Sequence, residues 1–260
     1  MCIRDSYKGA PLKNWLLFYP VEWLCSFWTD ILITINKEDY NLALKSMHAQ
    51  KIKYIPGVGI DLKYLNSLKI DRKLKRGELG LKENDFILLS VGELNENKNH
   101  ITVIKAVNEL INKEKIKNLK YIICGEGSKR KELESFIKEN NIENNVKLLG
   151  FRKDILEIYK ISNCFVFPSY REGLSVSLME AMASKLPCIV SKIRGNIDLI
   201  DEKGGFIIAP EDWKSFSKKI QFLMNNIDIQ RRMKDYNLKK IEYFEIKIIK
   251  MTLLKIYFNN

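Results

Sequence analysis

Histidine is scarce in this chain of 260 residues, which contains only His48 and His100. Neither histidine has a serine, cysteine or metal-ligand partner at a diagnostic spacing, and no D-x-D cluster is present. We therefore interpret both histidines as structural. This excludes a histidine-based nucleophile and a metal centre from the functions that the motifs favour.

The five cysteines form no C-x-x-C pair, which argues against a zinc or redox motif. Three of them lie in apolar, strand-like runs, so we expect core thiols of a reducing compartment. No apolar run approaches the ~20 residues that span a bilayer, and no signal-peptide pattern opens the chain. The sequence predicts a cytoplasmic protein.

Basic residues outnumber acidic ones, with 44 Lys and Arg against 32 Asp and Glu, which gives a net charge of +12. Such a field favours an anionic membrane surface or an anionic donor. It would also favour nucleic acid, but no nucleic-acid recognition motif is present. A compositional bias towards Lys, Asn and Ile explains the charge equally well, so the charge alone identifies no partner.

The most informative stretch is Phe165–Ala183, in which an apolar strand runs into a polar turn and a helix follows at once. Glu172 lies in the turn and Glu180 inside the helix, ~8 Å along its axis at ~1.5 Å per residue. Free N–H groups at the helix start suit a phosphate, and carboxylates suit sugar hydroxyls. This layout favours a nucleotide-sugar site over a glycosidase pair, whose two carboxyls face each other across one bond. The alternative is that Glu172 caps the helix and Glu180 is solvated.

From residue 85 onward, short apolar runs alternate with helical patterns, which predicts an α/β fold with a doubly wound parallel sheet. Ligands bind at the carboxyl ends of the strands in such sheets, and the motifs fall there. Gly125 and Gly127 are followed by Arg130, so the G-x-G-x-x-G spacing of a nicotinamide-binding domain is incomplete. The predicted strands are 86–91, 120–124, 146–149, 164–168, 187–191 and 206–208, and the predicted helices are 98–113, 128–139, 154–160, 175–184, 195–201 and 211–224.

Several segments in this order resemble the retaining glycosyltransferases of family 4, which have the two-domain GT-B fold. The resemblance covers roughly residues 7 to 258. Four segments carry the resemblance beside Phe165–Ala183. Ser90–His100 is similar to the family's first strand and phosphate loop, and Ile123–Gly127 to the end of its second strand. Leu149–Ile155 is similar to the loop that meets the nucleobase, and Arg194–Ile200 to the turn after the fifth strand.

The resemblance implies a division of labour among the site residues. Glu172 is expected to meet the donor sugar as the catalytic acid, and Glu180 to bind the ribose. The nucleobase loop would be Phe151, Arg152 and Lys153. The donor diphosphate would be bound by Lys98, Gly173, Leu174, Ser175 and Val176.

Gly92 and Glu93 are further candidates in the phosphate loop. The family often has an arginine at the position of Glu93, so this sequence departs from the pattern. Arg152 or Lys153 is the candidate for the second cation, and the alternative is that both are exposed surface residues. The resemblance implies a transfer without a metal or other cofactor. The helix dipole and Lys98 would then stabilise the leaving diphosphate.

The expected organisation is GT-B type, with one complete Rossmann-like domain and the tail of a second. Residues 1–60 would be a remnant of the acceptor-side domain, with residues 1–6 consistent with a fusion scar, and 61–82 a linker. Residues 83–235 would be the donor-binding domain, and 236–260 a C-terminal helix that packs back towards the first domain. The chain is therefore expected to be truncated.

Residues 12–28 form an apolar stretch with three of the four tryptophans, Trp15, Trp23 and Trp28. We favour a buried helix of the first domain. The alternative is an interfacial segment, flanked by Lys8 and Lys13, that touches the bilayer.

The expected function is transfer of a hexose or N-acetylhexosamine from a nucleoside-diphosphate sugar, UDP above all, to a glycan or lipid-linked acceptor with retention, in surface polysaccharide biosynthesis. The expected partners are the nucleotide sugar, this acceptor and an anionic membrane at its inner face, without nucleic acid. The alternatives are a nucleotide-sugar epimerase or hydrolase of the same fold and a catalytically silent nucleotide-sugar-binding module.

Overall fold

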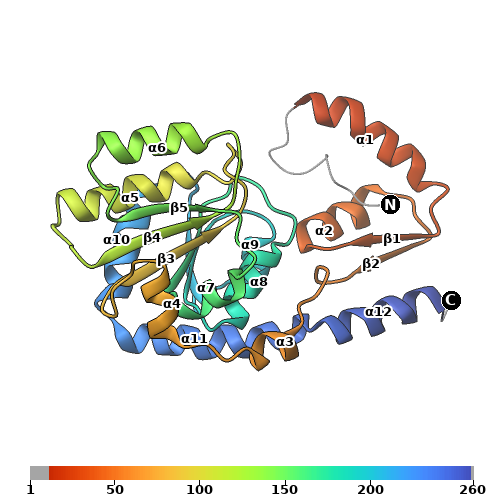
Figure 1. Ribbon diagram of the computed structural model, residues 1–260. Helices are drawn as coiled ribbons and strands as arrows, with labels where there is room; N and C mark the ends of the chain where they lie inside the picture. The colour runs from red at the N-terminus through yellow and green to blue at the C-terminus, as the bar shows by residue number, and fades with distance from the viewer. Residues whose placement is uncertain (1–11, 259–260) are drawn as a thin grey trace. The chain divides into compact units, whose positions relative to one another are not determined.

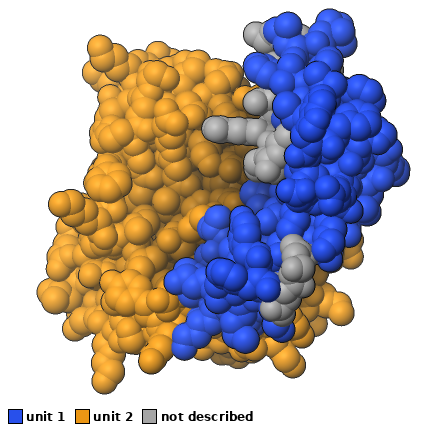
Figure 2. All heavy atoms as spheres, turned by 90° about the vertical axis from the view of Figure 1, so that its right-hand side faces the viewer, with its two compact units in different colours: residues 1–59, 244–260 blue, residues 60–243 orange. Residues whose placement is uncertain are grey.

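The computed structural model describes residues 12–258, with the backbone alone for residues 13–15 (Figure 1). The predictions for residues 1–6, for Lys8 and for the side chains of Lys13 and Trp15 lie outside the described residues. The chain divides into two compact units, a smaller one of residues 1–59 with 244–260 and a larger one of residues 60–243 (Figure 2).

The larger unit is built on a six-stranded, wholly parallel sheet in the order β5-β4-β3-β6-β7-β8. Its strands read as nearly continuous apolar runs, because helices cover both faces of the sheet. The chain order reverses between β3 and β6, where Leu88 pairs with Cys164. This reversal is the topological switch point, where open α/β sheets bind their ligands. The strands are β3 (Phe86–Val91), β4 (Leu119–Cys124), β5 (Val146–Gly150), β6 (Cys164–Phe167), β7 (Cys188–Ser191) and β8 (Gly205–Ile208).

Helices α5 and α10 pack together on one face of this sheet, and α8 packs against α11 on the other (Figure 1). In α5, Val103, Val107 and Leu110 recur at helical spacing and are fully buried. The helices of the larger unit are α3 (Leu62–Ser67), α4 (Arg72–Glu78), α5 (His100–Asn112), α6 (Arg130–Glu139), α7 (Ile155–Ile161), α8 (Val176–Ala183), α9 (Asn196–Leu199), α10 (Trp213–Met224) and α11 (Ile227–Ile241), followed by a 3₁₀ turn (Glu242–Phe244).

Strand and helix positions agree with the sequence prediction to within a few residues, and the predicted α/β class is confirmed. The segment predicted as a linker, 61–82, instead folds as α3 and α4 within the larger unit. Arg76 shows why, since its buried guanidinium donates to the main-chain oxygens of Ile161 at 2.7 Å and Glu83 at 2.7 Å. Residues 61–82 are lysine-rich and show no apolar face, so the sequence did not indicate that Arg76 would bind main-chain oxygens of the larger unit.

The smaller unit contains a two-stranded parallel sheet with a small core of Leu32, Ala43 and Met47. Asn36 caps its second helix, as predicted, by accepting from the Asp39 amide at 2.8 Å. The elements are α1 (Leu12–Ser26), β1 (Ile31–Thr34), α2 (Lys37–Ser46), β2 (Lys51–Tyr54) and α12 (Ile246–Phe258).

Helix α1 differs from the favoured prediction, because it is exposed rather than buried. Leu16 is 67% exposed and Leu17 is 64% exposed, and Trp28, just beyond the helix end, is 76% exposed. Within residues 12–258, no helix is both long and apolar enough to cross a membrane.

Three cysteines are core thiols, as predicted. Cys124, Cys164 and Cys188 are buried in β4, β6 and β7, and all three are free. Burial raises the pKa of Cys124 to about 12, so this thiol stays protonated and unreactive at neutral pH.

Candidate active site at the switch point of the sheet

A partly buried ion pair bridges the switch point of the sheet. Lys98 follows β3 and Glu172 follows β6, and Lys98 Nζ lies 2.6 Å from Glu172 Oε1. The two side chains are only 19% and 13% exposed, and the ammonium also lies 4.8 Å from the centre of the Phe167 ring. An ammonium carries three N–H donors, so Lys98 can hold Glu172 and a phosphate oxygen at once.

The loops after β3 and β6 are held together by two asparagines. The Asn97 carbonyl accepts from the Tyr170 amide at 2.8 Å, and its side chain donates to the Arg171 carbonyl at 3.0 Å. Asn99 adopts the left-handed conformation at φ 51° and donates to the Pro168 carbonyl at 3.1 Å. These contacts fix the spacing between Lys98 and the turn that carries Glu172.

Helix α8 begins at the end of this turn. Ser175 is its N-cap, and the Ser175 hydroxyl accepts from the Leu178 amide at 3.4 Å. The first N–H groups of a helix lack partners within it and carry its positive dipole end. Val176 is 43% exposed at this end, so the amino terminus of α8 is accessible to an anion. The predicted diphosphate residues Gly173, Leu174, Ser175 and Val176 therefore lie in one segment that starts beside Glu172.

Glu180 lies half-buried in the same helix, next to Tyr159 of α7. Burial raises the pKa of Glu180, and the neighbouring Tyr159 hydroxyl partly offsets that effect. The Tyr159 hydroxyl also donates to the Ser177 carbonyl at 2.9 Å. A carboxylate held away from water in this way gains from a hydroxyl-rich ligand that replaces the lost hydrogen bonds.

A third loop, after β7, meets the same turn through main-chain contact. Gly195 has φ +78°, and a Cβ built there would lie 2.1 Å from the Gly173 carbonyl oxygen. Only glycine fits this position without moving the turn. The adjacent Asn196 is buried and donates to the Ser191 carbonyl at 3.2 Å, which holds the loop on the end of β7.

The predicted nucleobase loop follows β5 at the same edge of the sheet, two strands from β3. Gly150 turns the chain at φ +71°, and Phe151 then stands 75% exposed. Arg152 binds the Asp154 carboxylate in a bidentate pair at 2.8 and 2.6 Å. The charge of Arg152 is therefore paired with Asp154 within the loop. Lys153 is exposed, so its ammonium can contact a bound anion.

Gly92 and Glu93 lie where predicted, in the turn after β3. The Lys98 side chain crosses over Gly92, where a Cβ would lie 3.1 Å from Lys98 Cε. Glu93 is exposed and its carboxylate accepts from Asn95 at 2.9 Å. His100 is buried below, 3.3 Å from the Glu93 carbonyl, and burial lowers its pKa to about 4. These contacts fit the predicted structural role for His100.

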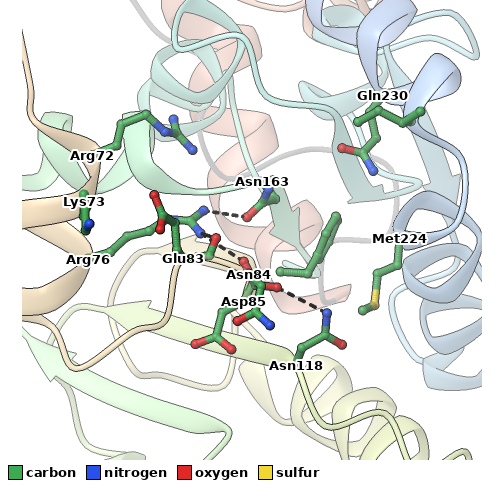
Figure 3. Close-up of a pocket in the computed structure, with 12 residues that line it drawn as sticks. Arg72, Lys73, Arg76, Glu83, Asn84, Asp85, Asn118, Asn163, Met224 and Gln230 are labelled. Carbon is green, nitrogen blue, oxygen red and sulfur yellow. Dashed lines mark hydrogen bonds between the residues drawn. The ribbon is translucent and has the colours of Figure 1, made fainter.

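A cavity of about 530 Å³ lies at the opposite, amino-terminal edge of the sheet (Figure 3). Phe86 opens β3 there, and Asn118 and Asn163 immediately precede β4 and β6. Its most buried cation, Arg76, already donates to main-chain carbonyls and to the Asn163 side chain at 3.0 Å. The cavity is therefore remote from the predicted donor site and offers little unpaired charge.

Among the described residues, no group of histidine, cysteine and acidic side chains could hold a metal ion. The structure brings Lys98, Glu172 and the 173–176 segment together at the switch point, with Glu180 one helix turn further on. Sequence reasoning missed the roles of Asn97, Asn99 and Gly195. The asparagine-rich run around Lys98 was a signal for the first two, because Asn tolerates left-handed backbone and makes local hydrogen bonds.

A doubly wound parallel sheet with a partly buried lysine–glutamate pair and an open helix terminus at its switch point is an arrangement typical of nucleotide-binding α/β domains. The chain belongs to the family of group 1 glycosyl transferases, which matches residues 71–240. This family membership confirms the resemblance and identifies the fold as GT-B.

Two curated relatives and one crystal structure illustrate the similarity. The putative glycosyltransferase EpsD of Bacillus subtilis is 36% identical, over 87% of this chain and 60% of its own length. A UDP-Gal:alpha-D-GlcNAc-diphosphoundecaprenol alpha-1,3-galactosyltransferase of Escherichia coli is 34% identical, over 81% of this chain and 56% of its own length. Anabaena HepE (Alr3699), crystallised in complex with UDP, has a TM-score of 0.87 at 18% identity, covering 100% of this chain and 71% of that one.

The chain spans about 60% of the length of EpsD and 56% of the length of the galactosyltransferase. The likeness to HepE is one of fold.

Proposed function

We propose that this chain carries the donor-binding half of a retaining glycosyltransferase that uses a UDP-sugar. The observation that carries the proposal is the Lys98–Glu172 pair at 2.6 Å, set between the loops after β3 and β6 and beside the amino terminus of α8. Cation, helix terminus and carboxylate together match a sugar diphosphate, which is anionic at one end and hydroxylated at the other. The UDP complex of the structurally similar HepE supports the choice of uridine.

In the proposed mechanism, Lys98 and the N–H groups of the 173–176 segment bind the diphosphate. They stabilise the negative charge that grows on it as the bond to the sugar breaks, the task that a metal performs in other transferases. Glu172 orients Lys98 and meets the donor sugar. Glu180 accepts from the ribose hydroxyls, and the loop from Phe151 to Lys153 contacts the base.

The proposed donor sugar is a hexose or an N-acetylhexosamine, and the proposed acceptor is a glycan or a lipid-linked sugar in surface polysaccharide biosynthesis. The diphosphoundecaprenol-linked substrate in the name of the Escherichia coli relative supports a lipid-linked acceptor. Retention of configuration follows the family resemblance.

The test is titration calorimetry of UDP against the wild-type chain, Lys98→Ala and Glu180→Ala. Both changes are expected to weaken binding, Lys98→Ala by about ten-fold or more, because a hydrogen bond to a charged group contributes ~1.5–3 kcal/mol. Lys105→Ala is the control, because Lys105 is an exposed lysine of helix α5, which begins two residues after Lys98, and it lies outside the proposed site. UDP binding that neither site change weakens contradicts the proposal.

Parallel titrations with GDP and ADP test the base, and a wild-type chain that binds none of the three nucleotides refutes the donor site. Incubation with a UDP-sugar alone separates the rival functions. An epimerase or hydrolase converts the donor without an acceptor, whereas a silent module binds it and leaves it intact.

We also propose peripheral contact with an anionic membrane through helix α1. Its Leu16 and Leu17 are largely exposed, and the chain carries a net charge of +12. Apolar side chains and positive charge together favour an anionic bilayer. Co-sedimentation with phosphatidylglycerol vesicles tests this, with Leu16→Ser/Leu17→Ser expected to reduce binding and the exposed Leu74→Ser as control. Equal binding of both variants contradicts the contact.

A further inference from the structure

A lysine outside the predicted site is surrounded by three carboxylates. Lys75 lies in α4, and its Nζ is 2.6 Å from Asp154 Oδ2, 2.8 Å from Glu157 Oε2 and 3.1 Å from Glu78 Oε2. The Lys75 side chain is only 10% exposed. Removing an ammonium from water is costly, so an arrangement with three anions around one cation fixes the geometry of all of them.

Asp154 is the member that links this cluster to the loop after β5. It occupies the N-cap position of α7, yet its carboxylate makes no capping hydrogen bond to that helix. Both oxygens instead bind Arg152, at 2.8 and 2.6 Å, and one of them also binds Lys75. An aspartate at an N-cap ordinarily binds the helix amides, so this carboxylate is used for a different purpose.

The electrostatics keep Lys75 and Asp154 charged at neutral pH. Asp154, followed by Glu157, raises the pKa of Lys75, and Arg152, followed by Lys75, lowers the pKa of Asp154. The lysine and the aspartate therefore remain ionised together through neutral pH, and the pair does not act as a pH switch.

The segment that the cluster holds is Phe151–Lys153. Its backbone is set at one end by the left-handed Gly150, where a Cβ would lie 2.4 Å from Glu126 Oε1, and at the other end by Asp154. Between these anchors Phe151 is 75% exposed. An exposed aromatic ring at the carboxyl edge of a sheet presents a flat apolar face, and nucleobases stack on such faces.

We propose that Lys75 is a positioning residue for the nucleobase. Acting through Asp154, it fixes Arg152 and holds the 151–153 loop in its binding conformation before the nucleotide arrives. The inference rests on the proposed donor site. It adds Lys75 of helix α4, which lies outside the motifs at the carboxyl edge of the sheet. Preorganisation of this kind raises affinity because less ordering is left to the binding step.

The test compares UDP with pyrophosphate, which has the diphosphate and no base. In Lys75→Met, UDP affinity is expected to fall about ten-fold. A ten-fold loss corresponds to about 1.4 kcal/mol, which is roughly the entropic cost of ordering one residue when UDP binds. Pyrophosphate affinity is expected to stay at the wild-type value. Lys75→Arg, which keeps the charge, should recover most of the loss.

Lys73→Met is the matched control, because it removes an exposed lysine from the same helix α4. Thermal unfolding of each variant shows whether the titrated protein is folded. If Lys75→Met is unfolded at the assay temperature, Asp154→Asn replaces it, since this change removes the charge and keeps the side-chain volume.

The outcomes separate the two proposals. A wild-type chain that binds neither UDP nor pyrophosphate refutes the donor site itself. A wild-type chain that binds UDP, with Lys75→Met or its replacement equally tight, overturns the positioning role alone. Equal weakening of UDP and pyrophosphate also overturns it, because the effect is then a general loosening of the domain.

Discussion

At the scale of single residues, the two carboxylates of the candidate site have opposite electrostatic surroundings. Glu172 is neutralised by Lys98 at 2.6 Å, whereas burial raises the pKa of Glu180. A carboxyl whose pKa is raised in the folded state stabilises the fold below its unfolded pKa, and that contribution is lost as the pH rises through the folded pKa. The ionised Glu180 is therefore a cost to the free protein at neutral pH, consistent with a residue retained for binding.

This difference predicts opposite effects of two similar changes. Glu180→Gln is expected to raise the melting temperature at pH 7, because it removes a half-buried charge, and the gain should shrink as the pH falls towards the ordinary glutamate pKa of 4.5. Glu172→Gln is expected to lower stability by about 1–2 kcal/mol, because it removes the negative charge from the hydrogen bond that Lys98 donates. Thermal unfolding at pH 7 and pH 4.5 measures both. Equal signs at pH 7 would contradict this assignment.

His100 predicts a second pH effect. Burial lowers its pKa from 6.5 to about 4, so the unfolded chain binds a proton in this window that the folded chain does not. Stability is then lost as the pH falls from 6.5 towards 4, by about 2 kcal/mol at pH 5. Urea unfolding of wild type and His100→Gln at pH 7 and pH 5 isolates this share. A stability difference between the two proteins that is the same at both pH values would refute it.

At the scale of elements, the site is built where the loops after three strands touch through their main chains. The loop after β7 contacts the turn after β6 through Gly195, and that turn is bound to the loop after β3 through Asn97 and Asn99. The rigid sheet fixes the positions of the loop ends, and these contacts fix the loops themselves. Lys98 and Glu172 meet for this reason.

Gly195→Ala is expected to disturb this assembly. The new Cβ would lie 2.1 Å from the Gly173 carbonyl oxygen, on a backbone with φ +78°, so the variant should lose about 2 kcal/mol of stability and bind UDP more weakly. Gly77→Ala is the control, because a Cβ there meets nothing within 4 Å. That helical position should gain about 0.5–1 kcal/mol and leave UDP affinity unchanged. Chemical denaturation and calorimetry measure both, and unchanged UDP binding by folded Gly195→Ala would contradict the role of this contact.

At the scale of the whole molecule, the two units differ greatly in what stabilises them. The larger unit buries strands on both faces, whereas the smaller unit has a core of Leu32, Ala43 and Met47, with Ile55 and Ile249 also buried. Chains that fold as more than one unit commonly unfold in more than one step. The smaller core is expected to melt first.

Scanning calorimetry with and without UDP tests this division. Two transitions are expected, and UDP at about 100 times its Kd should raise only the upper one, since ~2.7 kcal/mol of linkage corresponds to roughly 5–10 °C for a unit of this size. A single transition, or a UDP shift of the lower one, would show that the units do not behave separately.

Much of the larger unit was predictable because its signals are local. Apolar runs such as 164–168 and the helical periods between them depend on neighbours in sequence, and so does the capping residue Asn36 of the smaller unit. The folding of residues 61–82 was missed, because Arg76 is held by main-chain oxygens of residues remote in the sequence, such as Ile161. No local pattern records a partner of that kind.

The sequence by itself determined the α/β class, the position of each strand of the larger unit, and the presence of a lysine and an acid after strand ends with a second acid in the following helix, because side-chain period and turn chemistry are properties of neighbouring residues. Only the tertiary structure decided that Lys98 and Glu172 form an ion pair, that Gly195 allows two loops to touch, and that Lys75 reaches the loop after β5 through Asp154. Those relations join residues far apart in the chain. They arise only when the order of strands in the sheet and the packing of α4 on α7 bring the residues together.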